Sequence, residues 1–167
     1  MKIKKLTLSA LFIAIGVLSS HLLYIPVGVA KAFPVQHAIN LLAATLLGPA
    51  YGVAIAFIVS LLRNILGTGS LLAFPGSMIG VFLAAILYQK THRYSLAMAG
   101  EVIGTGIIGA FVSYPVAKIF MGREVAMFFF VIPFSASTVV GVVLGAIILK
   151  GLLHIKSIHS ISGGGQL

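Results

Sequence analysis

The chain has 167 residues, of which 60% are apolar and only 8% are charged. In a soluble domain about a quarter of the residues are charged, so this chain lacks the side chains needed to cover a surface that faces water. The composition therefore predicts an integral membrane protein. Its formal charge of +9 is expected to come from basic loops at the membrane surface and not from a nucleic-acid interface.

The side chains that most enzymes use are nearly absent. There is no cysteine, and the two acidic residues are Glu101 and Glu124. This excludes disulfides, thiolate metal sites, carboxylate pairs and Ser/His/Asp triads. No histidine has a second histidine three or four residues away, as a zinc site on a helix would need. We therefore expect that the chain is not an enzyme and has no cofactor or metal.

Successive apolar segments predict an all-α, polytopic membrane bundle of about six transmembrane helices, since about 20 apolar residues cross the hydrocarbon core. The first segment follows a basic start, and a loop with two prolines separates it from the second. The second segment is too short to cross upright and is expected to lie partly within the protein. The segments are 6–23, 36–47, 50–66, 71–88, 95–117 and 125–149. Residues 1–157 should form a single transmembrane domain, and 158–167 a flexible cytoplasmic tail.

The distribution of Lys and Arg predicts the orientation. If the N-terminus is cytoplasmic, seven of the 11 basic residues face the cytoplasm and four face outward. Because cytoplasmic loops are enriched in Lys and Arg, both termini are expected inside a prokaryotic plasma membrane. The four outward residues are Lys31, Arg63, Lys118 and Arg123.

Small residues recur every four positions in most segments, for example Gly76, Gly80 and Ala84, or Gly100 and Gly104. Such rows allow helix backbones to approach closely, and we expect most of them to pack within the bundle. There is no convincing long-period repeat, which disfavours an inverted-repeat transporter.

Polar residues gather towards the predicted outer end of the bundle, where a small polar heteroaromatic ligand would fit among aromatic side chains. His37 and Asn40 share a helix face and are the first candidates for hydrogen bonds to it. Arg63 has an alternative role, in which it reaches outward to lipid headgroups. The candidate binding residues are Gln36, His37, Asn40, Arg63, Asn64, Ser135 and Ser137, followed by Lys31, Tyr114 and Glu101.

Glu101 is the acidic residue inside a predicted span. It lies about six residues, or roughly 9 Å, from the cytoplasmic end of its helix, which places it away from the outer cluster. We expect it to pair with Lys4, Lys5 or Arg93 in a structural role. Contact with the ligand is the alternative, because acidic groups within a membrane often mark functional sites.

Four stretches carry a resemblance to a known family: 30–37 (AKAFPVQH), 62–69 (LRNILGTG), 72–80 (LAFPGSMIG) and 100–106 (GEVIGTG). Together they resemble the ThiW family, and the likeness extends over about 6–149. ThiW proteins are substrate-binding S components of energy-coupling factor (ECF) vitamin transporters, assigned to hydroxyethylthiazole, the thiazole precursor of thiamine.

The resemblance implies that the chain captures its substrate from outside and then docks on a transmembrane T component driven by two cytoplasmic ATPase subunits. In that family an Ala-x-x-x-Ala row on the first helix meets the T component, and Ala10 and Ala14 match it. The absence of a Walker motif agrees with ATP hydrolysis by partners. Two alternatives stay open: an S component for another vitamin or a pyrimidine precursor, and a self-sufficient small-solute transporter.

The predicted ligand is a neutral thiazole, which needs apolar walls and two or three hydrogen bonds but no ion pair. His37 and Asn40 would supply those bonds, with Gln36 and Asn64 as the next choices. Arg63 would then orient its neighbours.

The predicted orientation can be tested with single cysteines, since the chain has none of its own. Lys2→Cys and Thr91→Cys should resist an impermeant thiol reagent in intact cells, because both positions are expected in the cytoplasm. Thr68→Cys should react. Labelling of the first two variants would show that the orientation is reversed.

Overall fold

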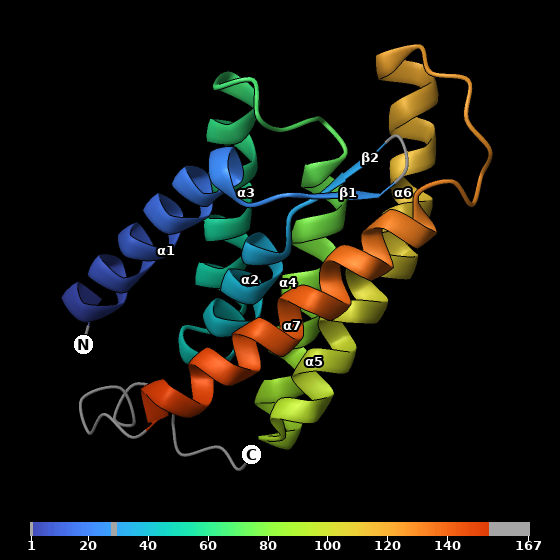
Figure 1. Cartoon of the computed structure of the whole chain (residues 1–167). Coiled ribbons are helices and arrows are strands. Elements are labelled where there is room, and N and C mark those ends of the chain that lie inside the picture. The colour runs from blue at the N-terminus through green and yellow to red at the C-terminus, as the bar shows by residue number, and fades with distance from the viewer. Residues whose placement is uncertain (1, 28–29, 154–167) are drawn as a thin grey trace.

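The computed structural model describes residues 2–27 and 30–153, which form a bundle of helices (Figure 1). Its helices are α1 (Lys2–Leu22), α2 (Pro34–Leu46), α3 (Pro49–Ile65), α4 (Ala73–Thr91) and α7 (Val131–Leu153). A further long helix consists of α5 (Tyr94–Ile103), the π-helical turn η1 (Gly104–Gly109), α6 (Ala110–Pro115) and a second π-helical turn, η2 (Val116–Phe120). The predicted all-α membrane bundle is confirmed. The predicted tail, 158–167, lies outside the described residues.

A short hairpin stands where the sequence predicted only a loop. Its strands, β1 (Ile25–Val27) and β2 (Ala30–Ala32), pair antiparallel, with Ile25 opposite Ala32. Pro26 prevents α1 from continuing, and the strand pairing provides hydrogen-bond partners for backbone groups that the helix would have used. The hairpin exit is fixed to α7, because the Phe33 N–H donates to Ser137 Oγ at 2.8 Å.

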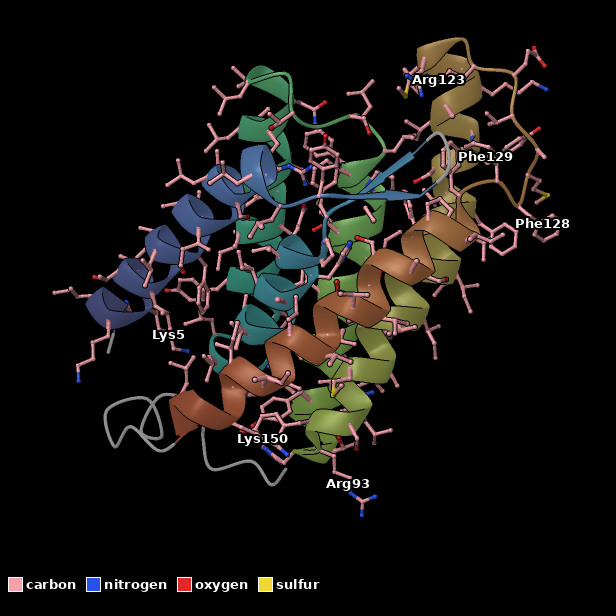
Figure 2. The ribbon with its side chains drawn as sticks, viewed as in Figure 1. Lys5, Arg93, Arg123, Phe128, Phe129 and Lys150 are labelled. Atoms are coloured by element: carbon pink, nitrogen blue, oxygen red, sulfur yellow. The ribbon has the colours of Figure 1, made fainter. Side chains whose placement is uncertain are left out.

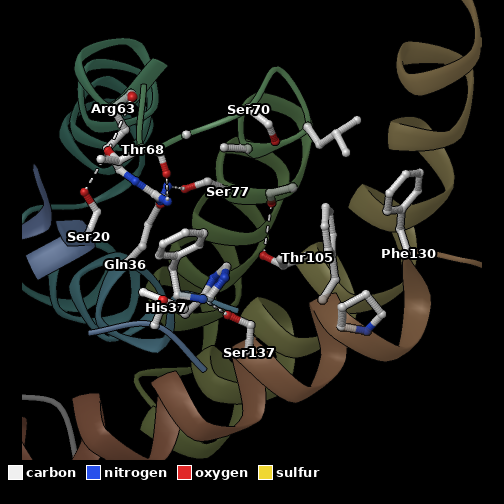
Figure 3. Close-up of a pocket in the computed structure, with 18 of the residues that line it drawn as sticks. Ser20, Gln36, His37, Arg63, Thr68, Ser70, Ser77, Thr105, Phe130 and Ser137 are labelled. Carbon is white, nitrogen blue, oxygen red and sulfur yellow. Dashed lines mark hydrogen bonds between the residues drawn. The ribbon is translucent and has the colours of Figure 1, made fainter. Parts of the chain in front are cut away.

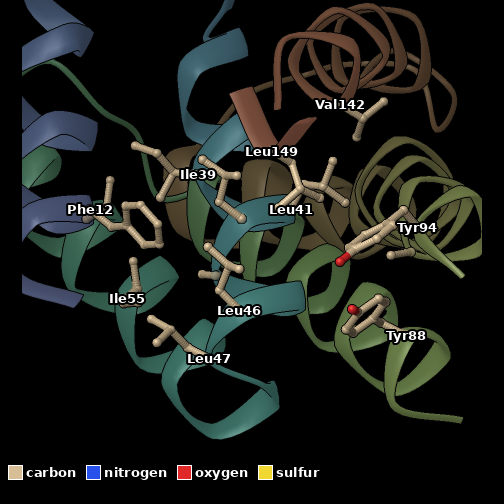
Figure 4. Packing of buried hydrophobic residues seen from close by; sticks show 14 of the residues in the cluster. Phe12, Ile39, Leu41, Leu46, Leu47, Ile55, Tyr88, Tyr94, Val142 and Leu149 are labelled. Carbon is tan, nitrogen blue, oxygen red and sulfur yellow. The ribbon is translucent and has the colours of Figure 1, made fainter. Parts of the chain in front are cut away.

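α2 lies inside the bundle, as its short length predicted. All of its residues except Val35 are buried, and α1, α3, α4, α5 and α7 all pack against it. Figure 4 shows Ile39 and Leu46 of α2 beside Phe12 of α1 and Ile55 of α3. α2 ends because Gly48 has a φ of +87°, which a glycine adopts without strain, and Pro49 then begins α3.

The outer surface of the bundle is suited to lipid. Among the described residues, four helical stretches are long and apolar enough to cross a membrane: Lys2–Ser20, Ala73–Thr91, Tyr94–Phe120 and Val131–Leu152. α3 is a shorter apolar helix. Large apolar side chains point outward along these helices, among them Leu18, Ile132 and Ile147. A continuous apolar exterior of this kind is stable in a bilayer and would aggregate in water.

Basic side chains mark one end of the bundle. Lys5, Arg93 and Lys150 lie at the end where α1 begins and α7 finishes, whereas Arg123 lies at the opposite end (Figure 2). This separation agrees with the arrangement that the charge count assumed. The side of the membrane on which each end lies stays a prediction.

Glycines allow α4 to pack directly against the helix formed by α5 and η1. A Cβ on Gly104 would lie 2.7 Å from the Gly80 Cα, and one on Gly109 would lie 2.6 Å from the Gly76 Cα. The same holds for Gly100, whose Cβ would lie 2.9 Å from the Cα of Ala84. The rows predicted to pack within the bundle thus do so along this crossing, and they bring the side chains of α5 and η1 close to those of α4.

Gly104→Ala should therefore destabilise the protein. The added Cβ would meet backbone atoms, which cannot rotate away, and overpacking of this kind costs about 1–3 kcal/mol. Gly151→Ala is the matched control, because a Cβ at Gly151 meets nothing within 4 Å. Thermal unfolding in detergent should show a lower midpoint for Gly104→Ala alone. Equal midpoints for the two variants would mean that α4 moves aside without cost.

Candidate binding site

A cavity of about 590 Å³ lies at the end of the bundle where α2, α4 and α7 begin and where α1 and α3 finish (Figure 3). Helices and connecting segments both contribute to its walls. Its aromatic lining residues are Tyr24, Phe33, Phe129, Phe130 and Phe134. Its polar and charged lining residues are Ser20, Gln36, His37, Arg63, Thr68, Ser70, Ser77, Thr105, Arg123 and Ser137.

Arg63 points into the protein and not towards lipid headgroups. Its side chain is 2% exposed. The guanidinium donates from Nη1 to Gln36 Oε1 and from Nη2 to the Thr68 carbonyl oxygen at 3.3 Å. It also lies over the Phe33 ring, 3.9 Å from the centroid, a distance typical of a cation–π contact. Of the two predicted roles, the buried one therefore fits the structure.

Gln36 connects three helices at the edge of the cavity. Its amide oxygen accepts from Arg63, which can only donate. This contact distinguishes the oxygen of the Gln36 amide from its nitrogen. The amide nitrogen donates to Ser77 Oγ of α4 at 2.9 Å and to Ser60 Oγ of α3 at 3.3 Å. Gln36 thereby holds the first turn of α2 against α3 and α4, and its own position is fixed in turn.

His37 lines the cavity and is oriented by Glu101. Its Nδ1 lies 3.0 Å from Glu101 Oε1, and the Glu101 side chain is fully buried. A carboxylate only accepts hydrogen bonds, so in the tautomer that pairs with a Glu101 carboxylate Nδ1 carries the hydrogen. Nε2 is then the ring nitrogen available to the cavity, and in the neutral ring it is an acceptor. The arrangement offers a fixed acceptor to a hydroxyl or N–H group of a ligand.

The predicted partners of Glu101 were wrong. Its Oε1 accepts from Asn40 Nδ2 at 2.8 Å and from Thr105 Oγ1 at 3.3 Å, in addition to His37. Lys5 instead lies over the Tyr51 ring, and Lys4 and Arg93 are exposed. The predicted depth of Glu101 was counted along its own helix only. It could not include the depth of α2, which brings its own donors down to the level of Glu101.

Of the first candidate residues, Gln36, His37, Arg63 and Ser137 line the cavity. Asn40 lies behind them, where its amide nitrogen also donates to Ser77 Oγ at 3.0 Å. Asn40 can therefore act on a ligand only through the residues that it holds.

The other candidates lie elsewhere. The Asn64 amide donates to the Ser60 and Ser70 carbonyl oxygens, which fixes the segment after α3. Ser135 packs against Gly106, where α7 meets η1. Tyr114, in α6, is not among the residues that line the cavity. Lys31 has its backbone in β2, and its side chain lies outside the described part of the structure.

Sequence reasoning missed two connecting segments that line the cavity. Residues 67–70 follow α3, and a Gly-Thr-Gly-Ser run was their only signal. Residues 121–130 contain Arg123, Phe129 and Phe130, and had been assigned mostly to the sixth helix. That helix begins at Val131 and not at 125. Hydropathy alone does not separate an apolar loop from a helix, whereas Pro133 near the start of α7 suits a first turn.

A family model described as "Thiamine-precursor transporter protein (ThiW)" matches residues 6–155. The chain belongs to the ThiW family. No curated protein and no solved structure matches it significantly. Its family therefore identifies this ThiW protein as a transporter of a thiamine precursor, in agreement with its membrane-spanning helices.

The cavity of this ThiW protein is built largely from the stretches that carry the family resemblance. The stretch 30–37 supplies Phe33, Gln36 and His37, and 62–69 supplies Arg63 and Thr68. The stretch 72–80 contributes the first two turns of α4, and 100–106 contributes the Thr105 hydroxyl and, one layer below, Glu101. Segments far apart in the sequence thus converge on one site.

Proposed function

We propose that this ThiW protein is the substrate-binding S component of an ECF-type ABC importer. In this role it captures hydroxyethylthiazole from outside the cell and delivers it inward after docking on a T component with two cytoplasmic ATPase subunits. The chain itself catalyses no reaction. The cavity would face outward, and both termini would lie in the cytoplasm of a prokaryotic cell.

The cavity is the observation that supports this proposal most. It combines aromatic walls with a few fixed polar atoms, the composition typical of small-molecule sites. The thiazole ring would lie between aromatic side chains such as Phe33 and Phe130. The ligand hydroxyl would donate to His37 Nε2, while the Ser137 hydroxyl, which accepts from the Phe33 N–H and also lines the cavity, would donate to the ring nitrogen. Each such hydrogen bond favours one orientation of the ligand, because a buried polar group left without a partner raises the free energy of the complex.

The exposed face of α1 supports docking on a partner. Ala10 and Ala14 are both exposed on the described bundle and stand one turn apart. Their small side chains leave a flat strip of helix backbone, which is the surface that close helix packing in a membrane requires. The row is thus free to contact a T component, in contrast to the glycine rows of α4 and α5.

Hydroxyethylthiazole binding is the first test of this function. Calorimetry on the purified protein should detect binding, and His37→Ala should weaken it because the ligand loses a hydrogen-bond partner. Asn40→Ala should also weaken binding, because Asn40 helps to hold Glu101, which in turn orients His37. Removal of one buried partner costs about 1–3 kcal/mol, or roughly tenfold to a hundredfold in affinity.

Ser135→Ala is the matched control, since Ser135 is a polar residue of α7 that does not line the cavity. Its affinity should equal that of the parent. If His37→Ala and Asn40→Ala also bind like the parent, the cavity is not the binding site. A parent protein that binds no thiazole would remove the substrate assignment and leave the transporter family in place.

Docking can be tested on α1 separately. Ala10→Trp and Ala14→Trp should abolish uptake in cells that also express the T component and the ATPases, because the bulky side chain separates the two helices. Ligand binding to the isolated protein should be unchanged. Ile15→Trp is the control: Ile15 is also exposed but lies about 100° further round the helix than Ala14. Undiminished uptake in the Ala10 and Ala14 variants would show that this row is not the docking surface.

A further inference from the structure

The cavity is lined by cationic side chains without an acidic one. Arg63 and Arg123 both line it, and the described lining residues include neither Asp nor Glu. Glu101 lies one layer below, where its Oε1 accepts from His37, Asn40 and Thr105. The walls of the site therefore carry a net positive charge.

Arg63 is buried, and no acidic group of the described residues 2–27 and 30–153 forms an ion pair with it. The groups that it contacts in the described part of the chain are neutral: the Gln36 amide oxygen, the Thr68 carbonyl oxygen and the Phe33 ring. Its Nε is buried and has no hydrogen-bond partner. A buried guanidinium normally pairs with a carboxylate or a phosphate, since neutral dipoles compensate only part of the lost hydration. Arg63 is thus a buried cation in the cavity wall with which an acidic group of a ligand could pair.

Helix dipoles do not offset this charge. α2, α4 and α7 begin at the cavity and present the positive ends of their dipoles, whereas α1 and α3 finish beside it and present negative ends. Each end amounts to about half an elementary charge, so opposite ends largely cancel. The charge of the lining itself therefore comes from the two guanidinium groups, while the buried Glu101 lies beneath it.

From this juxtaposition we propose that the cavity binds thiazoles that carry an acidic group, a phosphate monoester or a carboxylate. The acidic group pairs with Arg63, Arg123 is the second cation of the lining, and the ring lies against the aromatic wall. This inference rests on the proposed function: it keeps the thiazole ring and the transport role but replaces the neutral alcohol, which the sequence alone suggested, by an acidic thiazole.

Space and hydrogen-bond donors near Arg63 fit such a group. A cavity of about 590 Å³ falls within the range of about 300–1,000 Å³ that holds drug-sized ligands, so a single substituted thiazole would fill only part of it. Ser20, Thr68 and Ser70 line the wall on the side of Arg63 (Figure 3). The Ser20 and Thr68 hydroxyls donate to the Val17 and Arg63 carbonyl oxygens, so Ser70 is the hydroxyl of the three that would donate to a phosphate or carboxylate oxygen beside the guanidinium.

The test compares matched ligands by calorimetry in detergent. The probes are hydroxyethylthiazole, its monophosphate ester, the corresponding thiazole acetic acid and phenyl phosphate, which has no thiazole. At least one acidic thiazole should bind about tenfold or more tightly than the neutral alcohol, as expected for a charge-assisted pair. Its advantage should fall as the salt concentration rises if Arg123, which is exposed, takes part.

Variants then assign the preference to the two arginines. Arg63→Gln should abolish most of the preference and change binding of the neutral alcohol much less, whereas Arg63→Lys should retain part of it. Arg123→Gln should reduce it further. Arg93→Gln is the control, because Arg93 lies at the opposite end of the bundle (Figure 2). A variant that elutes as a single monodisperse species and keeps the melting midpoint of the parent is folded. If Arg63→Gln is not folded, Arg123→Gln is the variant that tests the preference.

The outcomes separate this inference from the proposed function. If the neutral alcohol binds as tightly as both acidic thiazoles, or the preference survives both Gln variants, the inference is wrong and the thiazole function stands. If no thiazole binds but phenyl phosphate binds in an Arg63-dependent way, the anion site stands and the proposed substrate is wrong. If none of the four probes binds, both are wrong.

Discussion

The structure depends on the burial of the polar first two turns of α2 within the protein. The first two turns of α2 contain Gln36, His37 and Asn40, and each of these side chains is buried. In a membrane protein such groups must find partners within the protein. Gln36 binds serines of α3 and α4, while His37 and Asn40 reach Glu101 on α5. The positions of α3, α4 and α5 around α2 follow from these contacts.

Close packing makes that network possible. α4 and α5 carry interlocking glycines, so Thr105 Oγ1 reaches the Gly76 carbonyl oxygen at 3.0 Å, and Glu101 stands close to Asn40. On the other side of α2, a Cβ on Gly145 of α7 would lie 3.1 Å from the Ala38 Cα. Small residues therefore allow close helix packing on both sides of α2. They bring the polar side chains close enough to hold one another in place, and a binding site needs its groups held to within about 0.5 Å.

The sequence was sufficient to predict the helices, because hydropathy and helix length are local properties. It also identified α2 as internal and brought Gln36, His37, Arg63 and Ser137 together at one end. It could not assign Glu101, whose partners depend on how deep α2 lies and on the crossing of α4 with α5. For the same reason it placed Asn40 in the cavity, although the side chain turns to Glu101 and Ser77 instead. The run of three phenylalanines at 128–130 was misread because an apolar segment at the membrane surface satisfies hydropathy whether or not it is helical.

The cavity is bounded partly by helices and partly by connecting segments, and this affects how it can respond to a ligand. Its floor consists of helical residues that are hydrogen-bonded across the bundle, whereas part of its wall comes from the segments 67–70 and 121–130. α1 connects this wall to the rest of the protein, since Ser20 Oγ lies 3.0 Å from Thr68 Oγ1 and Ala10 and Ala14 are exposed further along the same helix. A ligand can bias a conformational equilibrium only through contacts that differ between the two states. Ser20 and Thr68 both line the cavity, so a ligand that contacts either of them acts on α1, the helix that carries the exposed Ala10 and Ala14.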